Sequence, residues 1–160
     1  MKVTIGKNKF VGPNERPYIV AEIGSNHNGN MSLSKKLIKS AKRAGANCVK
    51  FQSFSESSLF SSKSYQINPG LKKMVSKYSM SEKQLIEMKN YSKRLNIDFA
   101  VTPFSKKEVD FLVNKINVDF IKIASSDLNY YEFLEYIAKK KKTIVLSTGL
   151  SNLSEIDEAI

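Results

Sequence analysis

The stretch DFAVTPFSKKEVDFLVNKINVDFIKIA, residues 98–124, predicts a strand, a helix and a second strand in succession. Residues 98–102 form one short apolar run, and residues 119–124 form another. Between them, Ser105 and Glu108 have the spacing of a capping box, which marks the start of a helix. The apolar residues that follow share one helical face: Val109, Leu112, Val113 and Ile116. Because strands this apolar are usually covered on both faces, the pattern favours parallel strands packed under helices.

The same alternation continues on both sides of this stretch. Further strands are expected at residues 18–23, 48–52 and 143–147, since each is a short apolar run that ends in polar or turn residues. Ser32 is expected to cap the helix after the first of them, and Gly45 to end it in the left-handed conformation. The chain therefore alternates strand and helix from residue 18 onward.

One segment, residues 53 to about 80, interrupts the alternation. Seven of the twelve residues from 53 to 64 are serine. The segment is therefore expected to be a loop with at most a short helical piece, and a loop of that length is usually functional or mobile. Capping boxes restart regular helices at Ser81 and at Asn152.

Five strand–helix units in this order predict an α/β fold. An open doubly wound sheet and a closed barrel both fit the pattern, but no glycine-rich nucleotide-binding loop follows the first strand, which disfavours the open sheet. The sequence ends at Ile160 in a helix that has just begun, and five units cannot close an eight-stranded barrel. We therefore expect residues 1–160 to form the N-terminal part of a parallel (β/α)8 TIM barrel, about its first five βα units.

The chain carries 26 Lys and Arg residues against 15 Asp and Glu, a formal net charge of +11. Such charge suits nucleic acid, an anionic membrane or small anionic substrates. Lysines are spread along the chain, and the one dense run, residues 139–142, is expected to be a solvated turn. No nucleic-acid-binding motif accompanies it. No apolar run approaches the roughly 20 residues of a membrane span, and no secretory signal opens the chain. We expect a cytoplasmic protein that binds neither nucleic acid nor membrane.

The chain has one cysteine, Cys48, and one histidine, His27. A single cysteine excludes an internal disulfide. One cysteine and one histidine also cannot form a multi-cysteine or multi-histidine metal cage within this chain. Cys48 is expected to be a small buried hydrophobe. The sequence leaves the role of His27 open.

Polar side chains end every predicted strand, at the edge where barrel enzymes carry out catalysis. These residues are Glu22, Lys50, Gln52, Thr102, Lys122, Ser125 and Ser147. A lysine is almost never buried without a partner, so a structural salt bridge to Glu22 would explain a single strand lysine. Two lysines at corresponding strand ends, Lys50 and Lys122, instead favour an anion-binding site.

Five motifs, in this order, resemble the sialic acid synthase family. They are YIVAEIGSNHNG (18–29), AGANCVKFQ (44–52), VTPF (101–104), FIKIASSD (120–127) and IVLSTG (144–149). The resemblance implies a (β/α)8 barrel that condenses phosphoenolpyruvate with an N-acetylated hexose, releasing phosphate and forming a sialic-type (nonulosonic) acid. The sequence does not say whether the hexose is N-acetylmannosamine, its 6-phosphate or a 2,4-diacetamido sugar.

The resemblance also implies roles for the strand-end residues. Phosphoenolpyruvate would be bound by Lys50, Thr102, Lys122, Ser125 and Ser147. Glu22 and Gln52 would contact the sugar, and Glu22, Lys50 and Lys122 are the expected catalytic residues. A divalent metal, Mn²⁺ or Mg²⁺, a homodimer and a C-terminal antifreeze-like domain are implied as well. The family's two metal-binding histidines lie on later strands, so we expect no metal ligand in this chain and no activity from this chain alone.

Two other functions stay open from the residues. A Schiff-base aldolase would use Lys122 or Lys50, because desolvated strand-end lysines perform that chemistry in barrels. A non-catalytic basic fragment would bind nucleic acid in a salt-sensitive way and release no phosphate.

Overall fold

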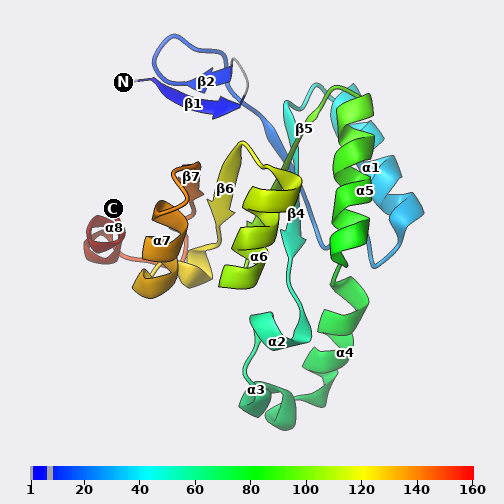
Figure 1. Ribbon diagram of the computed structural model, residues 1–160, viewed down its shortest axis with the longest axis vertical. Helices are drawn as coiled ribbons and strands as arrows, with labels where there is room; N and C mark the ends of the chain where they lie inside the picture. The colour runs from blue at the N-terminus through cyan, green and yellow to red at the C-terminus, as the bar shows by residue number, and fades with distance from the viewer. Residues whose placement is uncertain (1, 7–8) are drawn as a thin grey trace.

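The computed structural model describes residues 2–6 and 9–160 (Figure 1). An antiparallel hairpin comes first, formed by β1 (Val3–Gly6) and β2 (Lys9–Val11). The strands after it pair only in parallel: β3 (Val20–Gly24), β4 (Cys48–Ser53), β5 (Asp98–Pro103), β6 (Phe120–Ile123) and β7 (Thr143–Leu146). One sheet has the order β3-β4-β5, the other pairs β6 with β7, and β5 lies beside β6. The predicted α/β class with parallel strands is confirmed, and the hairpin is an addition that the sequence analysis did not anticipate.

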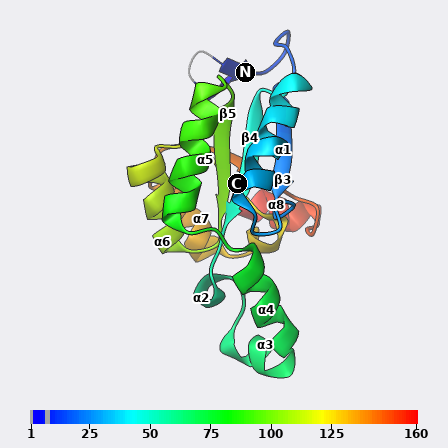
Figure 2. The same cartoon turned by 90° about the vertical axis from the view of Figure 1, so that its right-hand side faces the viewer.

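Helices connect the parallel strands and cover them (Figures 1 and 2). In chain order they are α1 (Met31–Arg43), α2 (Glu56–Leu59), α3 (Ser62–Ile67), α4 (Pro69–Tyr78), α5 (Glu82–Arg94), α6 (Lys106–Phe111), α7 (Tyr131–Ala138) and α8 (Leu153–Ala159). The predicted capping boxes at Ser81 and Asn152 are confirmed. The start of α1 was predicted wrongly: Asn30, not Ser32, caps it, because the Asn30 side chain accepts the Leu33 amide hydrogen.

The helix predicted from Ser105 to Ile116 changes its winding part-way. Its first half is α6, and residues Leu112–Ile116 form a π-helix that ends at Asn117, a residue with positive φ. The carbonyl of Ile116 accepts a hydrogen bond from the side chain of Lys89 on α5. Ile116 lies in the last turn, where carbonyls have no partner within the helix, so Lys89 satisfies a carbonyl at the helix end.

The serine-rich segment is not the loop that was predicted. Three short helices, α2, α3 and α4, occupy most of residues 54–79, which we call the arm. Ser55 and Ser61 precede α2 and α3 as N-caps, and Asn68 caps α4 with Pro69 in its first turn. Serine therefore starts helices here instead of preventing them. The arm projects beyond the carboxyl end of β4 (Figures 1 and 2).

The central strands divide their side chains between two environments, because strand residues alternate in direction. Outward-pointing Val49, Phe51, Val101 and Ile121 belong to the large apolar core under the helices. On the other face, the amino ends of the strands carry a smaller apolar cluster, made of Cys48, Ala100 and Phe120 with Ile5 of the hairpin. The polar candidates lie further along this second face, toward the carboxyl ends.

Two strands are less buried than predicted. Val20 on β3 is 36% exposed and Ile144 on β7 is 37% exposed, whereas the described residues of β4 are buried apart from Gln52. β3 and β7 are the outer strands of their sheets, so one side of each lacks a neighbouring strand among the described residues. The prediction that the strands are covered on both faces therefore holds far better for β4 and β5 than for β3 and β7.

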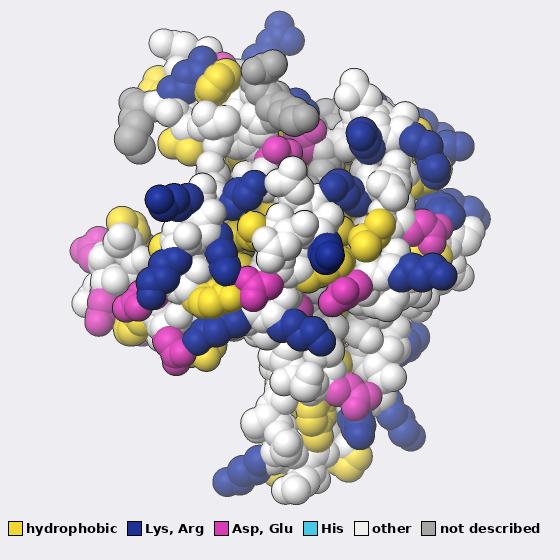
Figure 3. Space-filling model, in the orientation of Figure 1, with side chains coloured by type: hydrophobic (Ala, Val, Ile, Leu, Met, Phe, Trp, Pro, Cys, Tyr) yellow, Lys and Arg dark blue, Asp and Glu magenta, His cyan; other side chains and the backbone are white. Residues whose placement is uncertain are grey.

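The face seen in Figure 3 carries many basic side chains but no single dominant patch. Lys and Arg side chains are scattered over the face seen in Figure 3, with acidic side chains among them. The predicted turn between α7 and β7 is confirmed, and Lys141 within it has positive φ. Lys140 is not simply solvated, however, because its ammonium lies 2.6 Å from an Asp110 carboxylate oxygen and also donates to the Tyr136 hydroxyl. Within the described residues, no helix has the length and apolar character needed to cross a bilayer.

Candidate active site

The strand-end residues predicted from the sequence lie along the carboxyl edge of the parallel strands. The strands β3, β4, β5 and β6 each contribute at least one of them, and two more follow β6 and β7. Glu22 comes from β3, Lys50 and Gln52 from β4, Thr102 from β5, and Lys122 from β6, while Ser125 and Ser147 lie just after β6 and β7. Strand register brings them together, because Glu22 is aligned with Lys50 and Gln52 with Thr102.

Lys50 is the buried centre of this group. Lys50 is only 6% exposed, and its ammonium has two partners within the protein. It lies 2.5 Å from a carboxylate oxygen of Glu22 and donates a 2.9 Å hydrogen bond to the hydroxyl of Thr102. A buried lysine retains its charge only when it is paired in this way. The geometry therefore fixes a cation at the carboxyl ends of β3, β4 and β5.

Lys122 supplies a second cation on the neighbouring sheet. Its ammonium donates to the Ser147 hydroxyl and to the carbonyl of Ile123. Burial lowers the pKa of Lys122, the positive charge of Lys50 lowers it further, and Glu22 opposes that change. The two ammonium groups therefore repel each other across the gap between the sheets. A bound anion would relieve this repulsion, because one nearby carboxylate cannot neutralise two cations.

The remaining candidates are less tightly connected. The Gln52 side-chain oxygen accepts a 3.2 Å hydrogen bond from the hydroxyl of Ser25, in the loop after β3. Ser125 begins the short 3-10 helix Ser125–Asp127, and within the described residues its side chain makes no hydrogen bond to the other candidates. The structure thus joins Glu22, Lys50 and Thr102 directly, joins Lys122 to Ser147, and places Gln52 and Ser125 at the same edge.

Two residues near this edge were not selected by sequence reasoning. Ser25 contacts Gln52, and only the three-dimensional contact identifies it. Asp127 has a buried carboxylate oxygen without a hydrogen-bond partner among the described residues, and burial raises its pKa. The polar run after β6 was the available signal for Asp127.

His27, whose role the sequence left open, is a buried part of the loop after β3. Its Nδ1 accepts the amide hydrogen of Gly29 at 3.0 Å, and its ring lies 6.0 Å from that of Phe51. Burial lowers the pKa of the imidazole, which favours the neutral form that accepts this bond. His27 therefore supports the loop that follows Glu22.

The residues of this edge do not by themselves fit a divalent metal. Such an ion needs several carboxylate or imidazole ligands. Within the described residues, no three His, Cys, Asp or Glu side chains converge. Of the seven candidates, Glu22 alone carries a carboxylate, and it is already paired with Lys50.

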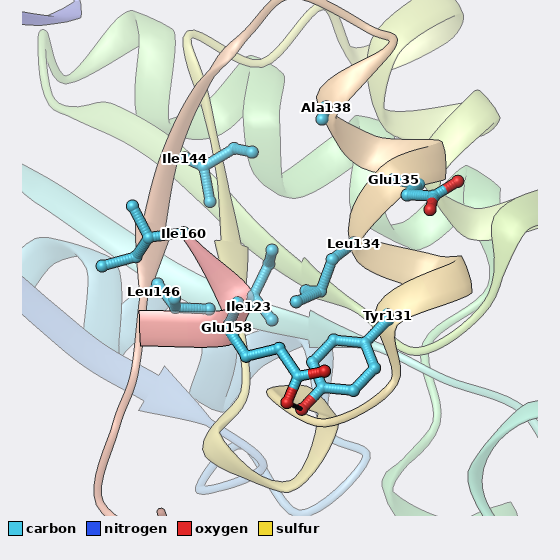
Figure 4. Close-up of a pocket in the computed structure, with 10 residues that line it drawn as sticks. Ile123, Tyr131, Leu134, Glu135, Ala138, Ile144, Leu146, Glu158 and Ile160 are labelled. Carbon is cyan, nitrogen blue, oxygen red and sulfur yellow. Dashed lines mark hydrogen bonds between the residues drawn. The ribbon is translucent and has the colours of Figure 1, made fainter. Parts of the chain in front are cut away.

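The apolar groove between α7, α8 and the β6–β7 sheet is a separate feature (Figure 4). Its volume is about 520 Å³, and Ile123, Leu134, Ile144 and Leu146 line it. The hydroxyl of Tyr131 donates a 3.0 Å hydrogen bond to Glu158 at its rim. Ile123 points to the opposite face of β6 from Lys122, so the groove lies on the outer side of the sheet and holds none of the seven candidates.

Comparison with known proteins places this arrangement in a family. The model of the NeuB family matches residues 37–160, most of the chain. The chain belongs to the NeuB family. This assignment agrees with the resemblance to sialic acid synthases found in the sequence motifs.

Relatives match most of this chain, and a solved structure matches its fold. An uncharacterized protein of Methanocaldococcus jannaschii is 42% identical over 99% of this chain and 45% of its own length. The N,N'-diacetyllegionaminic acid synthase of Campylobacter jejuni is 39% identical over 91% of this chain and 46% of its own length. The crystal structure of the N-acetylneuraminic acid (sialic acid) synthetase from Leptospira borgpetersenii, in complex with citrate, covers 99% of this chain and 53% of its own chain, with 31% identity and a TM-score of 0.89. The chain thus spans about half the length of the relatives it matches.

Proposed function

We propose that this chain is part of a synthase that condenses phosphoenolpyruvate with an N-acetylated hexose, giving a nonulosonic acid and inorganic phosphate. The observation that carries the proposal is a pair of lysines on the same edge, buried Lys50 on β4 and half-buried Lys122 on β6, separated by β5 and served by a single carboxylate, Glu22. Such a site suits a small, highly charged anion. NeuB membership, and relatives named for the synthesis of N-acetylneuraminic and legionaminic acids, support this reaction class.

In the proposed reaction, C3 of phosphoenolpyruvate attacks the aldehyde carbon of the open-chain sugar and a carbon–carbon bond forms. Water then adds at C2. The resulting tetrahedral intermediate breaks its C2–O bond to phosphate, and the phosphate leaves while C2 becomes a ketone. Each step moves negative charge within a trianionic substrate, so fixed cations that stabilise it in the transition state speed the reaction.

Each candidate residue has a role in this proposal. Lys50 and Lys122 hold the phosphate and carboxylate of phosphoenolpyruvate as point charges, and the hydroxyls of Thr102, Ser125 and Ser147 complete that site. Glu22 and Gln52 contact the sugar. Glu22 is well placed for proton transfer because its side chain is 53% exposed while one oxygen rests on Lys50.

The proposal extends to the rest of the protein. We propose that the chain supplies about the first five βα units of a closed (β/α)8 barrel, in a longer cytoplasmic protein that forms a homodimer. The divalent metal, Mn²⁺ or Mg²⁺, would be held by residues outside this chain. The antifreeze-like domain would also lie outside this chain. Support for this comes from relatives about twice as long.

The decisive test uses phosphoenolpyruvate labelled with ¹⁸O at the oxygen that bridges C2 and phosphorus. With the full-length protein and N-acetylmannosamine, its 6-phosphate or a 2,4-diacetamido sugar as acceptor, we expect the label in the released phosphate. Simple hydrolysis at phosphorus would leave the label in pyruvate, and that outcome would overturn the proposal. The sugar that supports release identifies the acceptor.

A Schiff-base aldolase is the second candidate, and one observation favours it. Burial and Lys50 lower the pKa of Lys122, which makes its amine more available as a nucleophile. Reduction with borohydride in the presence of pyruvate would trap Lys122 covalently in an aldolase. We expect no such adduct by mass spectrometry.

A further inference from the structure

Glu108, in the first turn of α6, joins two segments that follow neighbouring strands. One of its carboxylate oxygens accepts a 2.7 Å hydrogen bond from the backbone amide of Phe104, just after β5. The other accepts a 2.6 Å hydrogen bond from the hydroxyl of Ser58 on α2, the first helix of the arm. Fifty residues separate Glu108 from Ser58 in the chain. We call this three-residue contact the clasp.

Helix capping explains only part of the clasp. In a capping box the glutamate would bond the amide of the N-cap residue, Ser105. Here Ser105 does accept the amide hydrogen of Glu108, but the carboxylate reaches past it to Phe104. Its second oxygen is left for Ser58, which belongs to a different helix. The bond to Ser58 adds nothing to the start of α6, so it serves the attachment of the arm.

Both ends of the clasp lead directly to the candidate site. Phe104 lies two residues after Thr102, whose hydroxyl accepts the hydrogen bond from Lys50. Ser58 lies five residues after Ser53, the last residue of β4, which carries Lys50 and Gln52. Within the described residues Glu108 makes no hydrogen bond or ion pair with Lys50 or Lys122. It lines a serine-rich pocket of about 390 Å³ with Ser53, Ser58 and Ser105.

We propose that Glu108 is a positioning residue: through Phe104 and Ser58 it holds the ends of β5 and β4 in the register that sets the Lys50–Thr102 contact for phosphoenolpyruvate. This inference rests on the proposed function. Small displacements of a binding group cost large factors in affinity or rate, so a contact outside the site can control it. Burial raises the pKa of Glu108, and the hydrogen bonds from Ser58 and Phe104 oppose that rise.

The test compares substitutions that keep or remove the clasp in the full-length protein. Glu108→Gln retains both contacts, since its amide oxygen can accept from Phe104 and its amide nitrogen can donate to Ser58. Glu108→Ala removes both contacts. Ser58→Ala removes one of them together with the capping box of α2, in which the Ser58 hydroxyl accepts the amide hydrogen of Ser55. Glu82→Ala is the matched control, because Glu82 also lies in a first helical turn but is exposed. Affinity for phosphoenolpyruvate is measured by calorimetry, on folded protein at equal concentration.

We expect Glu108→Ala to weaken phosphoenolpyruvate binding about tenfold, Ser58→Ala to weaken it by a smaller factor, and Glu108→Gln and Glu82→Ala to bind within about twofold of the parent. If Glu108→Ala does not fold, the affinities of Ser58→Ala and Glu82→Ala for phosphoenolpyruvate are compared instead, and this comparison tests the inference. Unchanged affinity in Glu108→Ala, or in Ser58→Ala where it alone is folded, overturns the inference while the proposed function stands. A parent protein that does not bind phosphoenolpyruvate overturns the proposed function instead.

Discussion

The ammonium of Lys50 and the carboxylate of Glu22 lie 2.5 Å apart, but the two side chains differ sharply in burial, at 7% and 53% exposed. Strand pairing places them side by side, since Glu22 on β3 is aligned with Lys50 on β4. Lys50 has Thr102 as a second partner, whereas the side chain of Glu22 is open to solvent on its other side. The pair is therefore asymmetric: the lysine depends on its partners, and the carboxylate remains accessible to a substrate.

Replacing Glu22 by Gln separates a structural role from a catalytic one. A fully buried pair would lose roughly 3–5 kcal/mol of stability on such a change. Because Glu22 is half exposed and the amide oxygen of Gln can still accept from Lys50, which also keeps Thr102, we expect the free energy of unfolding to fall by less than about 1 kcal/mol. Turnover should fall by about 10²-fold or more. Glu87→Gln, in the exposed pair with Lys35, is the control and should change neither quantity.

Chemical denaturation and phosphate-release assays on one preparation of full-length protein measure both effects. A large loss of stability, with turnover intact in the folded fraction, would remove Glu22 from the catalytic residues. It would leave Glu22 as the structural partner of Lys50.

Lys122→Met should abolish activity without lowering the stability of the protein at neutral pH. We expect phosphate release to be abolished, because one of the two cations is lost. Burial and Lys50 lower the pKa of Lys122, so its charged form is disfavoured in the folded state, and it costs stability at neutral pH. That cost disappears as pH rises through the lowered folded pKa. The Met variant should therefore be as stable as the parent or more stable near pH 7, with the difference shrinking at alkaline pH.

The control for Lys122 has to be an exposed lysine. Lys140, in the dense run before β7, is unsuitable because it bonds Asp110 and Tyr136, so its removal would disturb the contact between α6 and α7. Lys83 on α5 is exposed and is the better choice. Equal activity of Lys122→Met and Lys83→Met would show that the charge argument is wrong.

Local patterns in the sequence identified most of the fold, because the strands and helix starts depend on neighbouring residues. Ser81 and Asn152 cap helices as their spacing predicts. Alternation within β4 also correctly separated Lys50 and Gln52 from Phe51, whose side chain enters the core. These inferences needed only the two-residue period of a strand and the geometry of a first helical turn.

What the sequence missed depends on contacts between distant residues. The arm was predicted as a loop because serine is a poor residue inside a helix, although Ser55 and Ser61 serve as caps here. The bond between Ser58 and Glu108 cannot be read from either local pattern. The same holds for Lys140, whose partner Asp110 is thirty residues away. For the site, strand ends could be predicted, but which side chains touch could not.

Cys48 should be chemically inert in the folded protein. It is fully buried at the start of β4, and burial raises its pKa to about 12, so almost no thiolate forms at neutral pH. Treatment with iodoacetamide at pH 7.5 should leave it unmodified, while the same protein in denaturant should be labelled completely. Intact mass spectrometry measures both. Rapid labelling without denaturant would mean that β4 is exposed, contrary to its place in the centre of the sheet.

Gly29→Ala tests how the arm is held against the loop after β3. Gly29 has a φ of +72°, which an alanine adopts only with strain, and an added Cβ would lie 2.4 Å from the backbone carbonyl oxygen of Lys77 at the end of α4. A carbonyl in a helix cannot move aside alone, so the arm or the loop must shift. We expect a loss of about 1–3 kcal/mol in the free energy of unfolding. Amide hydrogens of α4 should also exchange faster.

Gly149→Ala is the matched control for this substitution, because a Cβ there meets no atom within 4 Å and its φ lies outside the left-handed region. Its stability should stay within about 0.5 kcal/mol of the parent. Denaturant titration compares the two variants, and hydrogen–deuterium exchange followed by mass spectrometry locates the change. If Gly29→Ala were as stable as Gly149→Ala and α4 kept its protection, the close approach of Lys77 to the loop would be wrong. The arm would then be attached without this contact, through the bond from Ser58 to Glu108 and the packing of Phe54 against Phe104.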